Sequence, residues 1–322
     1  MSKITYTLSL LLLILCCNNS NLQAQVVRNT LGPFRMFEDI IYKQKQEEIL
    51  TSLADDLAEG RGTGTHGAML AASFIKKKFI QYGVQPLDKY YYQPFLVDSL
   101  KARNIIGIIP SIVPSDKYII IGAHYDNIGK LNGKVYNGAD SNASGITALL
   151  NLTDMFSAMR KSGMGPAKNI IIVAFDAKQY SMAGSKYFVD HLPVPKKNIT
   201  CMINFDQIGT SLEPLRMGKP NYLIVLGNNT LKRQHRDIIS TCNRFFNISL
   251  DLDFSFYGSK NFSELVYKLS DHYPFAEANI PALLFTSGFN KFTNKTTDDY
   301  GIINYKALKL RTILAFYTII RM

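Results

Sequence analysis

The strongest constraint on the fold is a series of short, strongly apolar runs that alternate with helical segments. The runs lie at 117–123, 169–175, 200–205, 222–226 and 282–286. Strands that are apolar on both faces are typical of parallel sheets covered by helices on both sides. The helices expected between them lie at 143–160, 183–191 and 231–247. The sequence therefore predicts a single α/β domain with a mixed, mostly parallel sheet and helices on both faces.

The remaining elements come from the same periodicities at the two ends of the chain. We expect helices at 35–59 and 66–82, then strands at 90–97 and 104–109. A last helix at 305–320 is apolar, but it carries Lys309 and Arg311. It is also too short to span a bilayer, so we expect it to pack against the domain.

The first 24 residues have the pattern of a secretory signal. Lys3 precedes an apolar run at 8–17, and a polar stretch then ends at Ala24. We therefore expect cleavage after Ala24, a mature domain at 25–322 with no transmembrane span, and a periplasmic or extracellular location. A lipoprotein signal ending at Cys16 or Cys17 is the less favoured alternative, because the residue before Cys16 is leucine, where a small residue is expected.

The basic charge does not point to nucleic acid. The net charge is +11, but lysine and arginine are spread along the chain, and the densest run is only Lys76-Lys77-Lys78. On a helix such a run is typical of a solvated face, so we expect no nucleic-acid partner. Cys201 and Cys242 are the cysteines left after signal cleavage. Pairing and burial as free thiols remain equally open.

Chemistry-bearing residues gather where predicted strands end. His124 directly follows strand 117–123, and Asp126 lies two positions later. Asp140 stands in the loop Gly-Ala-Asp-Ser-Asn-Ala-Ser-Gly, and Asp206 follows strand 200–205. Ligands in open α/β sheets collect at the carboxyl ends of strands. His124, Asp140 and Asp206 are therefore predicted zinc ligands, and Asp126 is predicted to orient the imidazole.

With these motifs the chain resembles the zinc exopeptidases of the aminopeptidase Y and leucyl aminopeptidase type (metallopeptidase family 28), which include glutaminyl cyclases. Further matching segments are Gly60-Arg61-Gly62-Thr63-Gly64-Thr65, Asn104-Ile105-Ile106-Gly107, Ala183-Gly184-Ser185, Ser270-Asp271-His272-Tyr273-Pro274-Phe275 and Ile280-Pro281-Ala282. The resemblance implies an aminopeptidase-like fold with two zinc ions bridged by one aspartate, which it places at Asp140. It also implies that His124 and Asp206 complete one of the two ions.

The resemblance also shows three substitutions in the other half of the site. The family pattern Phe-X-Ala-Glu-Glu corresponds here to Phe175-Asp176-Ala177-Lys178-Gln179. Lys178 thus stands at the position of the general base, and Gln179 stands at that of a zinc ligand. A late histidine ligand of the family is matched by Asn294. Neutral amides bind zinc far less well than carboxylate or imidazole, so we expect one ion at most.

Lys178 cannot easily replace a glutamate base. A lysine accepts a proton near neutral pH only if its pKa is strongly lowered, and neighbouring aspartates oppose that. We therefore hypothesise that the Lys178 ammonium occupies the position of the second metal and pairs with Asp140. The resemblance also places Asp271 and His272 near the pocket.

Two functional hypotheses follow. In the first, the chain is an exported, catalytically impaired exopeptidase-like protein, a pseudoenzyme that keeps a cleft for a peptide or protein ligand. In the second, it is an active aminopeptidase or other hydrolase with a single zinc on His124, Asp140 and Asp206. Asp176 or Asp271 would then serve as the general base. Loss of three groups from one catalytic unit favours the first hypothesis.

Overall fold

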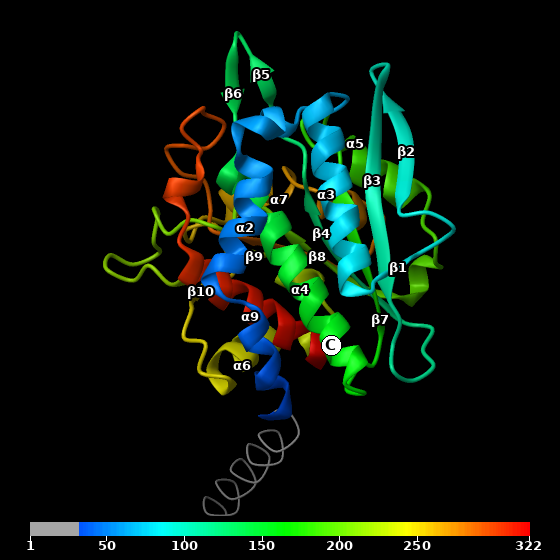
Figure 1. Ribbon diagram of the computed structural model, residues 1–322. Helices are drawn as coiled ribbons and strands as arrows, with labels where there is room; N and C mark the ends of the chain where they lie inside the picture. The colour runs from blue at the N-terminus through cyan, green and yellow to red at the C-terminus, as the bar shows by residue number, and fades with distance from the viewer. Residues whose placement is uncertain (1–31) are drawn as a thin grey trace, which may run out of the picture. The chain divides into compact units, whose positions relative to one another are not determined.

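The computed structural model describes residues 32–322 (Figure 1), and the chain divides after Ile40 into two compact units. The described part of the first unit is a 3-10 helix, Gly32–Ile40. The signal predicted at 1–24 lies outside the described residues. The second unit begins at Ile41 and contains the central sheet.

A nine-stranded mixed sheet forms the centre of this unit. Its order is β1-β3-β7-β4-β8-β11-β9-β10, and β2 pairs with β3 beside this path. The strands are β1 (Gln85–Pro86), β2 (Tyr92–Val97), β3 (Leu100–Ile109), β4 (Tyr118–His124), β7 (Asn169–Phe175), β8 (Ile199–Phe205), β9 (Tyr222–Leu226), β10 (Asp251–Asp253) and β11 (Ala282–Thr286). The four strands β7, β4, β8 and β11 run parallel to one another. A separate hairpin of β5 (Gly129–Leu131) and β6 (Lys134–Tyr136) lies outside the sheet.

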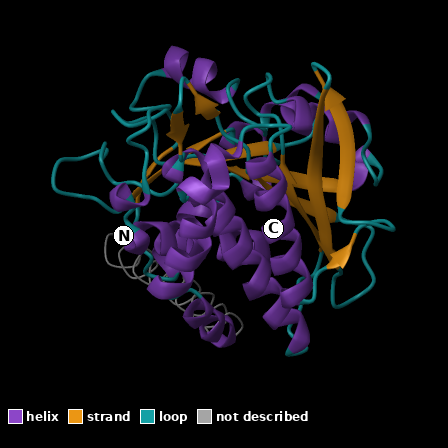
Figure 2. Ribbon diagram, turned by 45° about the horizontal axis from the view of Figure 1, so that its top comes forward, coloured by secondary structure: helices purple, strands orange, loops and turns teal. Residues whose placement is uncertain are grey.

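Helices cover both faces of the sheet. One layer consists of α2 (Lys43–Ala54), α3 (His66–Tyr82), α4 (Ser144–Lys161) and α9 (Tyr305–Arg321), which pack against one another (Figures 1 and 2). On the other face lie α5 (Ala183–Asp190) and α8 (Tyr273–Glu277), whose Phe188 and Phe275 pack on Ile120, Ile171 and Met202 of the strands. Two further helices are α6 (Ile238–Phe245) and α7 (Lys260–Tyr267). The fold class predicted from the apolar runs is confirmed.

Two predicted helices are wrong in extent. The helix expected at 35–59 is broken into the 3-10 helix Gly32–Ile40, then α2, then a 3-10 segment at Asp56–Arg61. The side chain of Asp55 accepts a hydrogen bond from the backbone nitrogen of Leu57 and ends the regular helix, and Glu59 takes a left-handed φ of 52°. The helix expected at 231–247 is shorter than predicted, because only α6 and a 3-10 turn at Arg233–His235 form there.

The structure answers whether the two cysteines pair and whether the last helix packs against the domain. Cys201 and Cys242 are both buried free thiols, so they do not pair. Helix α9 packs against α2, α4 and α6, and its Arg311 is fully buried. Within residues 32–322, no helix is both long and apolar enough to cross a membrane.

Candidate active site

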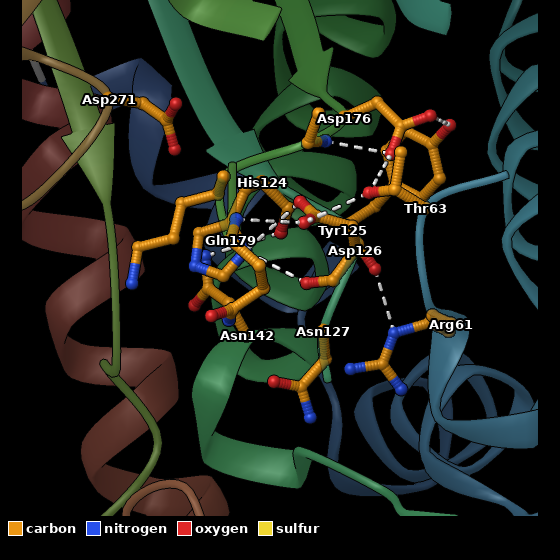
Figure 3. Close-up of polar contacts among 12 residues, drawn as sticks. Arg61, Thr63, His124, Tyr125, Asp126, Asn127, Asn142, Asp176, Gln179 and Asp271 are labelled. Carbon is orange, nitrogen blue, oxygen red and sulfur yellow. Dashed lines mark hydrogen bonds and ion pairs between the residues drawn. The ribbon is translucent and has the colours of Figure 1, made fainter. Parts of the chain in front are cut away.

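The carboxyl ends of β4, β7 and β8 bring a cluster of ionisable residues to one edge of the sheet (Figure 3). His124 is the last residue of β4, Asp176 directly follows β7, and Asp206 directly follows β8. All three side chains are buried. The sequence predicts the positions of His124 and Asp206 at strand ends, and the strands end there. The parallel register of the three strands therefore builds the candidate site.

His124 lies between two acidic residues. Its Nδ1 is 3.0 Å from the backbone oxygen of Asp126 and 3.6 Å from the Asp126 carboxylate. Its Nε2 is 3.4 Å from Oδ1 of Asp206. Burial alone would lower the pKa of His124, but Asp206 and Asp126 outweigh that effect and raise it to about 9. Asp126 thus contacts the imidazole at Nδ1, with its carbonyl oxygen making the shorter contact.

Asp140 does not join His124 and Asp206, and its side chain has other partners. Its Oδ1 accepts hydrogen bonds from the backbone nitrogen of Gly209 at 2.8 Å and from Ser144 at 3.2 Å. Its Oδ2 accepts one from Asn290 at 3.1 Å. Asp140 therefore ties its own loop to the segment that follows Asp206. In the same loop it is Asn142 that reaches the strand ends, donating to the backbone oxygen of Phe205 at 2.8 Å.

The donor set does not fit the zinc site that the resemblance implies. Nε2 of His124 and Oδ1 of Asp206 are buried without a hydrogen-bond partner, so two atoms that could act as metal donors face each other. A protein zinc site needs three or four such donors. Across residues 32–322, no three His, Cys, Asp or Glu side chains form a group that could hold a metal ion. The predicted set of His124, Asp140 and Asp206 is therefore not assembled.

Lys178 enters the site, but its partner differs from the hypothesis. Its Nζ lies 3.9 Å from Oδ2 of Asp206, and its side chain is 19% exposed. The expected pairing with Asp140 is thus wrong, because Asp140 is turned toward Gly209 and Asn290. Burial would raise the pKa of Asp206, but Lys178 and His124 together hold it well below its usual range.

The other two substituted positions lie at the surface. Gln179 is exposed, and its backbone nitrogen donates to Oδ2 of Asp126 at 3.2 Å. Asn294 is exposed and takes a left-handed φ of 58°. Its neighbour Thr293 donates a hydrogen bond to the side-chain oxygen of Gln207 at 2.8 Å. The loop that carries Asn294 is thereby tied to the segment following Asp206.

Asp176 is held by four donors and acts as a structural anchor in this geometry. Its two oxygens accept hydrogen bonds from Thr63 at 3.0 Å, the hydroxyl of Tyr125 at 2.8 Å, and the backbone nitrogens of Arg103 at 3.0 Å and Ala177 at 2.7 Å. Burial and the nearby Asp126 raise its pKa. With its lone pairs engaged in this way, Asp176 is poorly placed to take a proton from water. Thr63 was not singled out from the sequence, although it stands in the glycine-rich segment at 60–65.

Asp271 and His272 are both fully buried. Oδ1 of Asp271 accepts a hydrogen bond from Ser185 at 2.6 Å. The preceding Ser270 donates to Oδ2 of Asp206 at 2.6 Å and accepts from Asn204 at 2.9 Å. Burial raises the pKa of Asp271 to about 6. Asp271 and His272 are therefore buried directly after this serine, and Ser270 rather than either of them donates the hydrogen bond to Asp206.

Comparison with known proteins identifies the scaffold. The sequence pattern described as Peptidase family M28 matches residues 104–319. The chain belongs to peptidase family M28. Aminopeptidase YwaD of Bacillus subtilis is 30% identical over 191 residues, 58% of this chain and 36% of that protein. Leupeptin-inactivating enzyme 1 of Streptomyces exfoliatus is 24% identical over 233 residues, 72% of this chain and 45% of that protein. The chain thus spans less than half the length of these two relatives.

Solved structures confirm the aminopeptidase-like fold of this M28 chain. The LapA aminopeptidase of Legionella pneumophila superposes with a TM-score of 0.70 at 18% identity, over 90% of this chain and 74% of that one. A Zn-dependent exopeptidase from Parabacteroides distasonis superposes with a TM-score of 0.63 at 17% identity, over 88% of this chain and 100% of that one. The family and these neighbours make zinc the metal to test.

Two buried arginines hold the loops of the M28 scaffold around the site. Arg61 donates to the backbone oxygen of Tyr125 at 2.8 Å (Figure 3). It also donates to the backbone oxygens of Asn137 at 2.7 Å and Gly138 at 2.9 Å, and to that of Leu53. Arg311 donates to the backbone oxygens of Tyr222, Ile208 and Thr210, each at 2.7 Å. We call these two side chains the guanidinium clamps. One fixes the loops next to His124 and Asp140, and the other fixes the loop after Asp206.

His272 gives the M28 domain a testable acid sensitivity. Burial lowers the pKa of this imidazole to about 3, well below its usual 6.5. Between these values the unfolded chain binds a proton at His272 that the folded chain does not, so stability falls as pH drops from about 6.5 toward 3. The loss should approach about 1.4 kcal/mol per pH unit. Urea unfolding from pH 7 to 4.5 should show a weaker pH dependence in His272→Gln than in the wild type. Equal slopes would contradict this prediction.

Proposed function

We propose that this chain is an exported M28-family protein that has lost peptide hydrolysis and serves instead to bind a peptide or protein ligand. The observation that carries the proposal is the position of Lys178, an ammonium 3.9 Å from the Asp206 carboxylate where the resemblance expects a glutamate base. A general base must accept a proton from the attacking water. An ammonium paired with a carboxylate already carries its proton and cannot do so.

The other substitutions act in the same direction. The amides of Gln179 and Asn294 stand where the resemblance expects a carboxylate and an imidazole, and both residues are exposed. Asp140, the expected bridging ligand, is engaged with Gly209 and Asn290. The single-zinc hydrolase, which needs His124, Asp140 and Asp206 on one ion, finds no support in this arrangement. Defects within one catalytic unit do not add simply, but the loss of any essential group costs orders of magnitude in rate.

An apolar surface beside the site supports the binding role. The ring of Phe256 contacts those of Tyr257, Phe262 and Phe289, at centroid distances of 5.1, 5.2 and 5.5 Å. Tyr257 and Phe262 are each 43% exposed, and Phe289 is 38% exposed. Phe289 directly precedes Asn290, which binds Asp140, so this surface adjoins the loops of the site. Half-exposed aromatic residues are typical of surfaces that take apolar side chains of a ligand.

The proposal is tested by turnover on a purified chain of residues 25–322. A panel of aminoacyl reporter substrates is assayed with added zinc, beside the triple variant Lys178→Glu, Gln179→Glu, Asn294→His. We expect no turnover above background from the wild type, and bound zinc in the triple variant only. Chelator-sensitive turnover by the wild type would refute the proposal. The triple variant serves as the matched control that the assay detects restored metal binding.

A further inference from the structure

The backbone around Lys178 is fixed on both sides, so the side chain leaves from a rigid segment. The preceding Ala177 takes a left-handed φ of 59°, and its nitrogen donates to Asp176 at 2.7 Å. The backbone oxygen of Lys178 accepts a hydrogen bond from Met182 at 3.0 Å. The next nitrogen, of Gln179, donates to Asp126 at 3.2 Å. The direction of the lysine is therefore set by the end of β7 and by Asp126.

Asp206 is the buried carboxylate that this lysine approaches. Its side chain is 8% exposed, Oδ2 lies 3.9 Å from Nζ of Lys178, and Oδ1 lies 3.4 Å from Nε2 of His124. Ser270 donates to Oδ2 at 2.6 Å. A buried carboxylate is costly unless an opposite charge and hydrogen bonds compensate it. Here Lys178 supplies the opposite charge, and Ser270 supplies the hydrogen bond.

The same ammonium disfavours a metal ion at this carboxylate. A divalent cation bound to Asp206 would lie within a few ångströms of Nζ of Lys178, and like charges at that separation repel strongly in a partly buried site. The carboxylates of Asp126 and Asp206 face two basic side chains, His124 and Lys178.

We propose that the Lys178 ammonium takes the place of a zinc ion in this M28 scaffold, as the built-in cation that compensates Asp206. The chain then holds the ends of β7 and β8 together by an ion pair of its own in place of metal coordination. This inference deepens the proposed function and rests on it in one respect, the absence of zinc from this position. It further predicts that the thermal stability of the domain depends on the Lys178 charge and does not change when a chelator is added.

The test compares thermal unfolding and zinc content of four proteins of residues 25–322, in EDTA and in excess zinc. They are the wild type, Lys178→Met, Lys178→Arg and the control Lys186→Met, which removes an exposed lysine of α5. In EDTA, Lys178→Met should melt about 5 °C or more below the wild type, because it leaves Asp206 uncompensated. Lys178→Arg keeps the charge, so its melting temperature should fall by less than that of Lys178→Met. Lys186→Met should melt at the same temperature as the wild type. The wild type should hold no zinc and melt alike in both conditions.

Two results would overturn the inference. One is an equivalent of zinc bound by the wild type, and the other is a Lys178→Met variant that melts like the Lys186→Met control. If Lys178→Met does not fold, the double variant Lys178→Met, Asp206→Asn decides, since it removes both charges and should recover a folded state. A double variant that also fails to fold would refute the pairing. Reporter-substrate turnover is scored separately, so an active wild type with a destabilised Lys178→Met variant refutes only the proposed function.

Discussion

Replacing Arg61 by methionine is expected to lower the free energy of unfolding by about 3–5 kcal/mol. The guanidinium is fully buried and donates to the backbone oxygens of Tyr125, Asn137, Gly138 and Leu53. Methionine fills similar space without any donor, so these carbonyl oxygens lose a charged partner. Burial lowers the pKa of Arg61 only to about 10, which leaves it charged at neutral pH. Urea unfolding at pH 7 measures the loss.

Arg61→Lys is the matched control for that prediction. It keeps the charge, but a single ammonium cannot reach carbonyl oxygens from three separate segments as the planar guanidinium does. We expect its stability to fall between those of the wild type and Arg61→Met. A loss below about 1 kcal/mol in Arg61→Met would mean that the carbonyl oxygens find other partners, against the role assigned to this clamp.

Replacing Arg311 by methionine should have a comparable effect on the other side of the site. Arg311 is fully buried and links the loop after Asp206, through Ile208 and Thr210, to strand β9 at Tyr222. Its guanidinium also lies over the ring of Tyr222, 4.9 Å from the centroid. We expect a loss of about 3–5 kcal/mol in the free energy of unfolding, measured by urea unfolding.

The control for Arg311 is Lys309→Met on the same helix. Lys309 is half-buried and should contribute less than about 1 kcal/mol to stability. If Arg311→Met and Lys309→Met both lowered the free energy of unfolding by less than about 1 kcal/mol, the buried contacts of Arg311 would not be stabilising. Amide hydrogen exchange gives an independent readout, since faster exchange at Gly209 and Asn304 is expected in Arg311→Met only. The backbone nitrogen of Asn304 donates to the oxygen of Gly209 within the loop that this clamp fixes.

The fold was predictable because the information is local. Each strand of the parallel core is a short apolar run, and helices α3 and α9 follow from periodicity and their flanking residues. The broken helix at 35–59 shows the limit of this reasoning. Its interruption depends on Asp55 capping Leu57 and on left-handed backbone at Glu59, which its apolar spacing does not reveal.

The site was predictable where strands fix the side chains and not where loops do. His124 ends β4 and Asp206 directly follows β8, so the sheet register places them. Asp140 lies in a loop, and a loop aspartate can turn toward backbone donors such as Gly209 as readily as toward a ligand. The partner of Lys178 was predicted wrongly for the same reason, because the predicted pair depended on where the loop places Asp140. Arg61 and Arg311 were missed because their carbonyl partners are distant in sequence and leave no motif.

The guanidinium clamps hold the loops of the site by contacts that do not depend on the side chains of those loops. Arg61 and Arg311 hold the three loops through carbonyl oxygens, and backbone oxygens are present whatever side chains the loops carry. Exposed side chains of the clamped loops that make no contact with Arg61 or Arg311 can therefore be exchanged while these backbone contacts remain. For protein engineering, this makes the chain a suitable host, because new binding specificities can be introduced on these loops by side-chain substitution while the backbone is held by the two arginines.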